Sequence, residues 1–293
     1  MELRIVQGVI GLTLLGALVI FTAFPQIKPD WIQIGEGRGP RANSASFHRR
    51  GGDPRSVEAC LERGAEHFLD EEWEKAIKEL TEVLRQDPKN TDALFMRGAA
   101  WQNLDDNTKA LSDFDAVVRL EPDNPDAHFA HAEIQDALGN TAAARADLET
   151  VIRLAPDDFE AFRFRGKLRE EARDYKGALA DYQEAVRQAP DDAWSLNNLA
   201  WVLCTAPDAN LRDGQKALKT AKQAVKLDGG KESNTLNTLA AAYAEMGMFN
   251  EAQRTQSDAI KHAPDDDRAG MQSRLELYRT KRPYRLPAAE AKK

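Results

Sequence analysis

The chain of 293 residues contains very little cysteine, with Cys60 and Cys204 as the two thiols. Two cysteines so far apart in the sequence provide neither a disulfide framework nor the ligand spacing of a zinc site. The sequence also lacks the nucleotide loop G-x-x-x-x-G-K-[ST], the nucleophile elbow G-x-S-x-G, the metal motif H-E-x-x-H and a calcium-binding loop. We therefore expect no catalytic, cofactor-binding or metal-binding residues, and both cysteines as small buried side chains.

Positive charge is scarce in the centre of the chain. Residues 56–267 contain 25 Lys and Arg against 42 Asp and Glu, whereas residues 268–293 contain 8 against 2. Proteins that bind nucleic acid neutralise its phosphates with Lys and Arg, so the acidic centre argues against nucleic acid as a partner. The basic C-terminal stretch is interpreted as a solvated end.

One long apolar run lies near the N-terminus. Residues 5–24 contain no charged side chain, and Pro25 follows them. About 20 apolar residues span the hydrocarbon core of a membrane, so we predict an uncleaved transmembrane anchor after an N-terminal tail of residues 1–4. A cleaved signal sequence is an alternative, although the bulky Phe21 fits poorly at the third position before a cut after Ala23. A buried soluble helix is a further alternative.

The segment after this run predicts a tether. Residues 25–54 are rich in Gly and Pro, which is typical of a flexible linker. The positive-inside rule scarcely decides the orientation, because Arg4 on one side is opposed by Lys28, Arg38 and Arg41 on the other. The signal-like N-terminus favours export of the remaining chain across the membrane.

An internal repeat follows the tether. Pro88, Pro122, Pro156 and Pro190 stand 34 residues apart. Small, alanine and bulky positions keep the same step: Gly64, Gly98, Ala132 and Gly166; Ala76, Ala110, Ala144 and Ala178; Leu80, Phe114, Leu148 and Tyr182. This period is typical of helix–turn–helix arrays. Small residues let two helices approach closely, the bulky residue fills the adjoining space, and proline ends the second helix of each pair.

These positions resemble the tetratricopeptide repeat (TPR) family over residues 57–266. The resemblance implies an all-α fold, a right-handed solenoid of about six helix pairs within a TPR array at 55–266. The expected repeats are 57–90, 91–124, 125–158, 159–192, 193–232 and 233–266. A capping helix is expected at 267–281, with Met271, Leu275 and Tyr278 on its apolar side, followed by a tail at 282–293. Asp265 or Asp266 is expected to cap this helix.

The fifth repeat departs from the period. Its second helix begins five residues late, which places the extra residues in a lengthened turn around 206–212. The stretch beginning at Leu196 (LNNLAWVL), the one at Leu239 and the one at Arg274 resemble a planctomycete-type bacterial subgroup of TPR proteins. This resemblance assigns no reaction. Together with the apolar run, it implies a single-pass protein of a bacterial inner membrane.

Two groups of residues suggest chemistry, and each has a simpler explanation. His128 and His131 share one helical face near Glu133, as metal ligands do, but they occupy repeat positions that elsewhere hold packing residues. Acidic pairs recur just after the repeat prolines, at 157–158, 191–192 and 265–267. Carboxylates there accept hydrogen bonds from free N–H groups at a helix start, so we interpret them as helix caps.

In the TPR family the concave groove is lined chiefly by positions 2, 5, 9, 12 and 13 of each first helix. The resemblance therefore implies a partner-binding groove whose character changes along the array. Asn side chains both donate to and accept from a peptide backbone, and Trp offers a large contact area. The same Asn and Trp residues have an alternative role as structural residues of the subgroup. The candidate groove residues are Phe95, Phe129, Arg163, Lys167, Asn197, Trp201 and Asn237.

These features together predict a non-catalytic scaffold. Its partners are expected to be proteins or peptides bound in the groove, and its N-terminal helix is expected to hold it at the membrane. The alternative is a structural accessory subunit of a cell-envelope assembly complex that does not use the groove.

Overall fold

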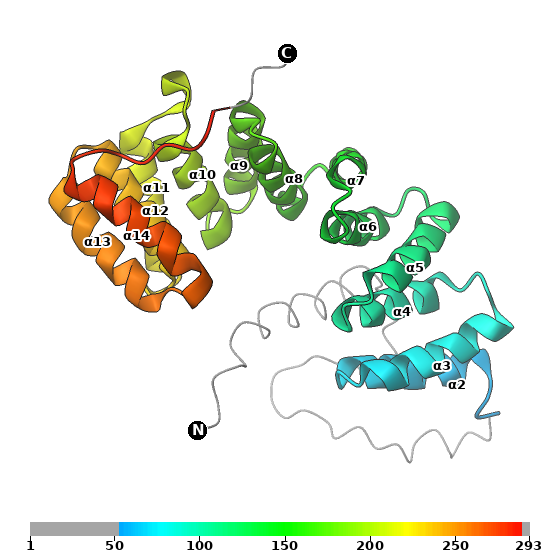
Figure 1. Cartoon of the computed structure of the whole chain (residues 1–293). Coiled ribbons are helices and arrows are strands. Elements are labelled where there is room, and N and C mark those ends of the chain that lie inside the picture. The colour runs from blue at the N-terminus through cyan, green and yellow to red at the C-terminus, as the bar shows by residue number, and fades with distance from the viewer. Residues whose placement is uncertain (1–52, 289–293) are drawn as a thin grey trace, which may run out of the picture. The chain divides into compact units, whose positions relative to one another are not determined.

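The computed structural model describes residues 53–288, and within them every regular element is helical. The helices form six successive pairs and one final helix (Figure 1). The first helices of the pairs are α2 (Val57–Leu69), α4 (Thr91–Asn103), α6 (Pro125–Ala137), α8 (Phe159–Glu171), α10 (Ala193–Thr205) and α12 (Ser233–Glu245). The second helices are α3 (Trp73–Gln86), α5 (Asn107–Leu120), α7 (Thr141–Leu154), α9 (Tyr175–Gln188), α11 (Gly214–Leu227) and α13 (Phe249–His262), and α14 (Asp265–Arg279) follows them.

Each first helix begins at the first position of its predicted frame, which confirms the helical period. Except at α12, the caps explain this regularity, because the side chain of the residue before the helix accepts a hydrogen bond from a free N–H group of the first turn. Asn90, Asn124, Asp158 and Asp192 all do so. In the acidic pairs, the second carboxylate is therefore the cap. At α14 the cap position is Pro264 instead, and the expected capping carboxylates lie in the first turn, where they face the positive end of the helix dipole.

The turn inside each regular pair is made by one residue with left-handed backbone geometry. It stands fifteen residues into the repeat, at Glu71, Asp105, Gly139, Arg173 and Gly247, with φ between 58° and 80°. Non-glycine residues in this region cost about 1 kcal/mol each, so the turn is held by the packing of the two helices on either side.

The lengthened turn of the fifth repeat lies where the sequence predicts it. It contains a short 3-10 helix, Ala209–Leu211, between α10 and α11. The Arg212 guanidinium donates to the carbonyl oxygens of Ala206 and Pro207 and to the Glu245 carboxylate, at 2.8, 3.0 and 3.1 Å. The insertion is thus tied to the ends of α10 and α12.

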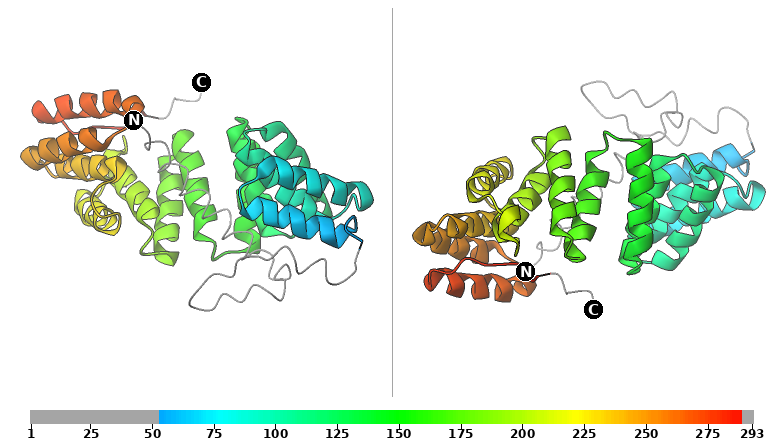
Figure 2. Two further views of the ribbon diagram at one scale, coloured as in Figure 1. Left: turned by 90° about the horizontal axis from the view of Figure 1, so that it is seen from below. Right: turned by 90° about the horizontal axis from the view of Figure 1, so that it is seen from above.

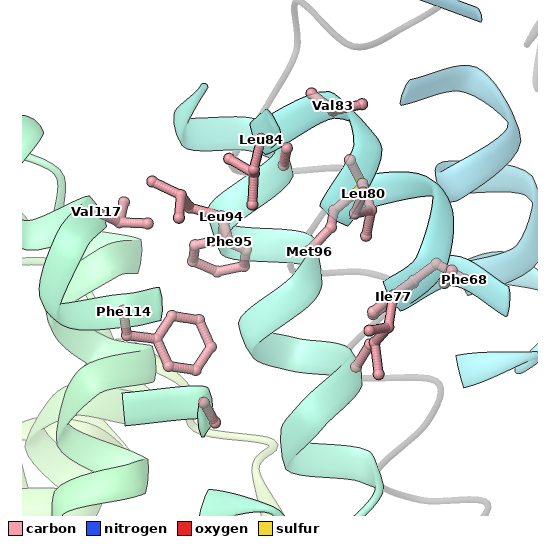
Figure 3. Packing of buried hydrophobic residues seen from close by; sticks show 14 of the residues in the cluster. Phe68, Ile77, Leu80, Val83, Leu84, Leu94, Phe95, Met96, Phe114 and Val117 are labelled. Atoms are coloured by element: carbon pink, nitrogen blue, oxygen red, sulfur yellow. The ribbon is translucent and has the colours of Figure 1, made fainter. Parts of the chain in front are cut away.

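The described chain divides within α7 into two compact units, unit 1 ending at Asp147 and unit 2 beginning at Leu148. In unit 1 the interlocked side chains of Leu80, Phe95, Phe114 and Val117 form the centre of the core (Figure 3). In unit 2 the core is built around Tyr182 and the apolar residues of α10, α11 and α12. The two further views in Figure 2 show the helices of a pair lying antiparallel.

The small repeat residues lie where two helices cross, as predicted. A Cβ atom on Gly64 would come within 2.9 Å of Leu80, one on Gly98 within 3.1 Å of Phe114, and one on Gly166 within 2.7 Å of Tyr182. Cys60 and Cys204 are both buried free thiols, which confirms the role expected of them.

The end of unit 2 is covered by α14, which begins and ends two residues earlier than predicted. Met271, Leu275 and Tyr278 are buried, as expected of a terminal cap, and Met271 and Tyr278 join clusters with residues of α12 and α13. The predicted transmembrane anchor lies outside the described residues. Among residues 53–288, no helix has the length and apolar character that crossing a bilayer requires.

Candidate partner-binding surface

An ion pair, partly buried to a different degree in each case, recurs inside each of the four regular repeats. It joins the seventh residue of the first helix to a carboxylate 16 residues later on the second helix. The pairs are Arg63–Glu79 (2.6 Å), Arg97–Asp113 (2.7 Å), His131–Asp147 (2.7 Å) and Arg165–Asp181 (2.7 Å). These pairs were not predicted from the sequence, although the spacing of 16 residues recurs with the repeat and is visible there.

The two histidines belong to this structural series. His131 donates toward Asp147 and Asp115, at 2.7 and 3.1 Å, and His128 lies 3.0 Å from the same Asp147 carboxylate and 3.0 Å from the carbonyl of Pro122. The hydrogen bond to Asp147 raises the pKa of His131, against the opposing effect of burial. Burial alone would raise the pKa of Asp147, but hydrogen bonds from His131 and His128 lower it. The two histidines therefore share the Asp147 carboxylate. Among the described residues, no group of three possible metal ligands occurs.

The predicted groove residues of unit 1 contribute mainly to packing. Phe95 is buried, and its ring meets Phe114 edge to face at a centroid distance of 5.4 Å. Phe129 is half-buried. These two rings therefore offer little free surface.

In unit 2 we use the term first-helix surface for the side chains at positions 2, 5, 9, 12 and 13 of α8, α10 and α12. The charged members of the prediction differ in exposure. Arg163 is half-buried and lies 3.3 Å from Asp192, the carboxylate that caps α10. Lys167 is exposed, 3.6 Å from Glu171. Arg163 is thus held at the start of α10, whereas Lys167 extends into solvent.

Asn197 and Trp201 lie one turn apart on α10. The Asn197 side-chain oxygen is buried, and no described residue donates a hydrogen bond to it. Trp201 is half-buried and stacks on Tyr284, with ring centroids 5.6 Å apart and planes inclined by 29°. Asn197 therefore has a side-chain oxygen without a donor, whereas the Trp201 ring is already covered by Tyr284 of the C-terminal segment.

Asn237 has a structural environment. It is 7% exposed, and its side-chain oxygen accepts from Gln256 at 3.0 Å and from Arg274 at 2.9 Å. These donors come from α13 and α14, so Asn237 connects α12 to the terminal cap. Arg274 connects Asn237 to Trp201, because it donates to the Asn237 oxygen and its guanidinium carbon lies 5.7 Å from the Trp201 ring centroid.

Trp194 was not among the predicted residues, although it occupies position 2 of α10. Its side chain is 65% exposed, the highest fraction among the large apolar side chains found exposed in residues 53–288. Trp194 and Asn197 stand one turn apart on the same helix, near the capping carboxylate of Asp192. Its place at position 2, one of the groove positions of the repeat, would have identified Trp194 as a candidate from the sequence.

Glu170 connects the surface to the core. Its carboxylate accepts from the Tyr182 hydroxyl at 3.0 Å and from Trp201. Burial raises the pKa of Glu170 to about 7, and these hydrogen bonds oppose the rise only in part. Glu170 therefore contacts both Tyr182 in the core and Trp201, the ring on which Tyr284 stacks.

The structure also shows an ordered segment within residues 282–293, which the sequence predicts to be a tail. Residues 282–288 leave α14 in an extended conformation and run across α10 toward α9 (Figure 1). The N–H of Leu286 donates to the carbonyl of Thr205 at 2.8 Å, and the Tyr175 hydroxyl donates to the carbonyl of Pro287 at 2.8 Å. The first-helix surface of unit 2 therefore holds an extended piece of polypeptide.

The geometry defines the class of the protein: a repeat of helical hairpins with a surface that can hold extended chain. Residues 61–125 and 129–193 match a family model described as tetratricopeptide repeat. No sequence among the curated proteins matches the chain.

Solved structures are similar in fold. A tetratricopeptide repeat protein from Parabacteroides merdae is 16% identical with a TM-score of 0.62, over 77% of this chain and 87% of that one. MamA from Desulfovibrio magneticus is 21% identical with a TM-score of 0.51, over 61% and 96%. YrrB, described as a TPR protein with an unusual peptide-binding site, is 16% identical with a TM-score of 0.53, over 66% and 97%.

The model of the TPR family matches these two stretches of the chain, and the solved structures share the fold of the described hairpins. That family is generally a non-catalytic scaffold for protein interaction. The planctomycete-type subgroup stays a prediction.

Proposed function

We propose that the protein is a membrane-anchored, non-catalytic TPR scaffold that binds a protein or peptide partner on the first-helix surface of unit 2. The observation that carries the proposal is the extended segment already held there, by main-chain hydrogen bonds and by ring stacking on Trp201. Hydrogen bonds to a backbone do not depend on side-chain identity, so a surface that makes them for one extended segment suits another.

The part of this surface left open is the start of α10. Trp194 is exposed there, and the buried side-chain oxygen of Asn197 has no donor. The Asn197 residue as a whole is half-buried, and an Asn side-chain amide can both donate to and accept from a partner's backbone. An exposed Trp beside it provides the large apolar contact that dominates binding energy at protein interfaces. We assign the partner to these two residues, with Arg163 beside them.

Both residues can be changed without harm to the fold. Truncating an exposed Trp removes few packing contacts, and replacing Asn197 by Ala removes a polar atom that has no partner. The test is affinity capture of the tagged full chain from detergent-solubilised membranes, comparing wild type with Trp194→Ala/Asn197→Ala. Loss of the captured proteins, with an unchanged melting temperature, is the expected result.

The matched control is Lys219→Ala/Lys226→Ala, which alters exposed residues of the second helix α11. The alternative function is a structural accessory subunit of an envelope assembly complex that leaves the first-helix surface unused by partners. The C-terminal segment already covers Trp201 and so leaves only part of the surface to a partner, which is the one respect in which it favours this alternative. Release of partners by the lysine variant, together with unchanged capture by the Trp194/Asn197 variant, would establish the alternative and refute the groove.

The anchor is proposed at residues 5–24, whose length and lack of charge suit a bilayer. We propose a bacterial inner membrane as its location, with the repeats outside the cytoplasm. Alkaline carbonate extraction should leave the full chain in the membrane fraction, and protease added to intact spheroplasts should digest the repeats. Protection of the repeats until the cells are lysed would place them in the cytoplasm and contradict the proposed orientation.

A further inference from the structure

The C-terminal segment has the chemistry of a bound peptide ligand. Its Tyr284 ring is stacked on Trp201, and the Arg274 guanidinium carbon lies 5.4 Å from the Tyr284 centroid and 5.7 Å from the Trp201 centroid. Stacking of this kind stabilises a contact beyond the burial of apolar area alone. Tyr284 therefore occupies an aromatic subsite made by α10 and α14.

The next residue occupies an acidic subsite. Arg285 lies 2.5 Å from a carboxylate oxygen of Glu245 and donates to the carbonyl of Cys204 at 3.2 Å. Glu245 has a side chain only 14% exposed, and its other oxygen accepts from Arg212. The half-buried Glu245 carboxylate therefore favours a positively charged side chain at the position that Arg285 occupies in the segment.

The remaining contacts are to the main chain of the segment. Thr205 accepts from the N–H of Leu286, Tyr175 donates to the carbonyl of Pro287, and Arg173 donates to the carbonyl of Ala288 at 3.1 Å. Pro283 and Pro287 stand at the two ends of the contact. Proline restricts the backbone before binding, so less entropy is lost when the segment is ordered.

The segment is an addition to a fold that is complete without it. Its residues are half-buried or exposed, and Leu286 joins the core of unit 2 only as a partly buried neighbour. The end of α14 is closed before the segment begins, because Thr280, Lys281 and Arg282 donate their N–H groups back to the last turn. Removal of residues 283–293 therefore leaves the helices and their caps in place.

We propose that residues 283–288 are a displaceable self-ligand, and that this end of the surface binds segments of the type Pro-aromatic-Arg-Leu-Pro. A partner that carries such a segment binds by displacing the chain's own C-terminus. The inference rests on the proposed function, because it names the chemistry of the partner for the same surface. The uncovered start of α10 supplies the further contacts that let a partner compete.

The tether sets the strength of the competition. A ligand joined by a short linker experiences an effective concentration in the millimolar range, so it outcompetes the same peptide added free at micromolar concentration. The intact chain should bind the free segment about 100-fold more weakly than a chain that lacks its own copy.

The test uses a fluorescein-labelled synthetic peptide with the sequence of residues 281–288, followed by anisotropy. It is titrated with the full chain and with the otherwise full chain that ends after Arg282. We expect saturable binding to the shortened chain, at least about 100-fold weaker binding to the intact chain, and no binding of a control peptide with Tyr284→Ala and Arg285→Ala. A shortened chain that keeps its helical circular dichroism but does not bind the peptide overturns the inference.

A second variant covers the case in which shortening damages the fold. The full-length variant Tyr284→Ala/Arg285→Ala retains the chain but loses the two side chains that fill the aromatic and acidic subsites, so it should bind the wild-type peptide. Loss of cooperative unfolding in both variants would make the segment a structural seal and overturn the inference. The two proposals fail separately. Peptide binding without any captured partner refutes the proposed function alone, whereas a partner lost with Trp194→Ala/Asn197→Ala, combined with no peptide binding, refutes the self-ligand alone.

Discussion

His131 and Asp147 form the one histidine–carboxylate pair in a series of arginine–carboxylate pairs, with His131 Nδ1 lying 2.7 Å from Asp147 Oδ2. The same two repeat positions are occupied by arginine and a carboxylate in the other regular repeats. Arginine is charged at every accessible pH, but histidine is not. The third repeat has therefore exchanged a permanent ion pair for one that depends on pH.

Replacing His131 by Arg should remove this pH dependence. The pKa of folded His131 is raised above its ordinary value of 6.5, so the folded chain binds the proton more tightly than the unfolded chain. Its stabilisation is complete below pH 6.5 and is lost as the pH rises through the folded pKa. The free energy of unfolding of His131→Arg should therefore gain on the wild type as the pH rises from 6 to about 8, measured by urea denaturation.

His128 and Asp115 face the same group and remain in the variant, so the comparison isolates His131. Asp147→Asn serves as the control, because it removes the shared acceptor charge and should destabilise most strongly near pH 6. A constant difference between His131→Arg and wild type across this range would contradict the assignment.

Among the ion pairs that recur with the repeat, Arg165–Asp181 is the most buried, so breaking it should lower the free energy of unfolding the most. The Asp181 side chain is 3% exposed and receives both Arg165 and Arg169, each at 2.7 Å. Asp181→Ala leaves two partly buried guanidinium groups without their carboxylate, which should lower the free energy of unfolding by about 3 kcal/mol. Asp258→Ala breaks an exposed pair with Lys261 and should cost less than about 0.5 kcal/mol. Equal losses in the two variants would show that burial does not set the value of these pairs.

The periodic elements could be predicted from the sequence because each has a local cause. The start of α8 is determined by Asp158, which caps it, and the crossing of α8 and α9 by Gly166 under Tyr182. Such features depend on residues within one repeat, and the 34-residue step repeats them. The pair Arg165–Asp181 was equally local, but it became visible only when opposite charges were compared at the same two repeat positions.

The candidate surface could be predicted only in part, because its main features join residues far apart in the sequence. Asn237 looked like a groove residue by position, yet Arg274 on α14 uses its side-chain oxygen. Tyr284 lies in a stretch with no hydrophobic period, so nothing local indicates that it stacks on Trp201. Contacts made by a single extended segment leave no pattern for a repeat analysis to detect.

Close helix packing makes a sharp prediction at two glycines. A methyl group on Gly166 would lie 2.7 Å from the Tyr182 ring, whereas one on Gly270 would meet nothing nearer than 3.7 Å. Gly166→Ala should therefore destabilise by about 1–2 kcal/mol through overpacking, despite the better helix propensity of alanine. Gly270→Ala, within α14, should stabilise by about 0.5–1 kcal/mol. Thermal unfolding of both variants measures this, and a stabilising Gly166→Ala would show that α8 and α9 pack less closely than described.

Glu170 makes the stability of unit 2 depend on pH. Burial raises the pKa of its carboxyl group from 4.5 to about 7, so the folded chain holds the proton more tightly than the unfolded chain. The free energy of unfolding should therefore fall as the pH rises from about 4.5 to 7, by about 1–3 kcal/mol. Glu170→Gln keeps an oxygen that accepts from the Tyr182 hydroxyl but cannot ionise, so the variant should be more stable than wild type at pH 8 and similar at pH 5.

Glu170→Gln also tests whether the charge of Glu170 affects the stacking of Tyr284, in the C-terminal segment, on Trp201. Trp201 donates to Glu170 and stacks on Tyr284, so a neutral acceptor at position 170 should leave the stacking in place. Urea denaturation at the two pH values measures the stability, with Glu171→Gln as the control for loss of a neighbouring, more exposed carboxylate. A parallel pH profile for Glu170→Gln and wild type would mean that Glu170 is ionised with an ordinary pKa. The Glu170 carboxylate would then be charged over most of the range from pH 5 to 8, and its titration would not change the binding of the C-terminal segment there.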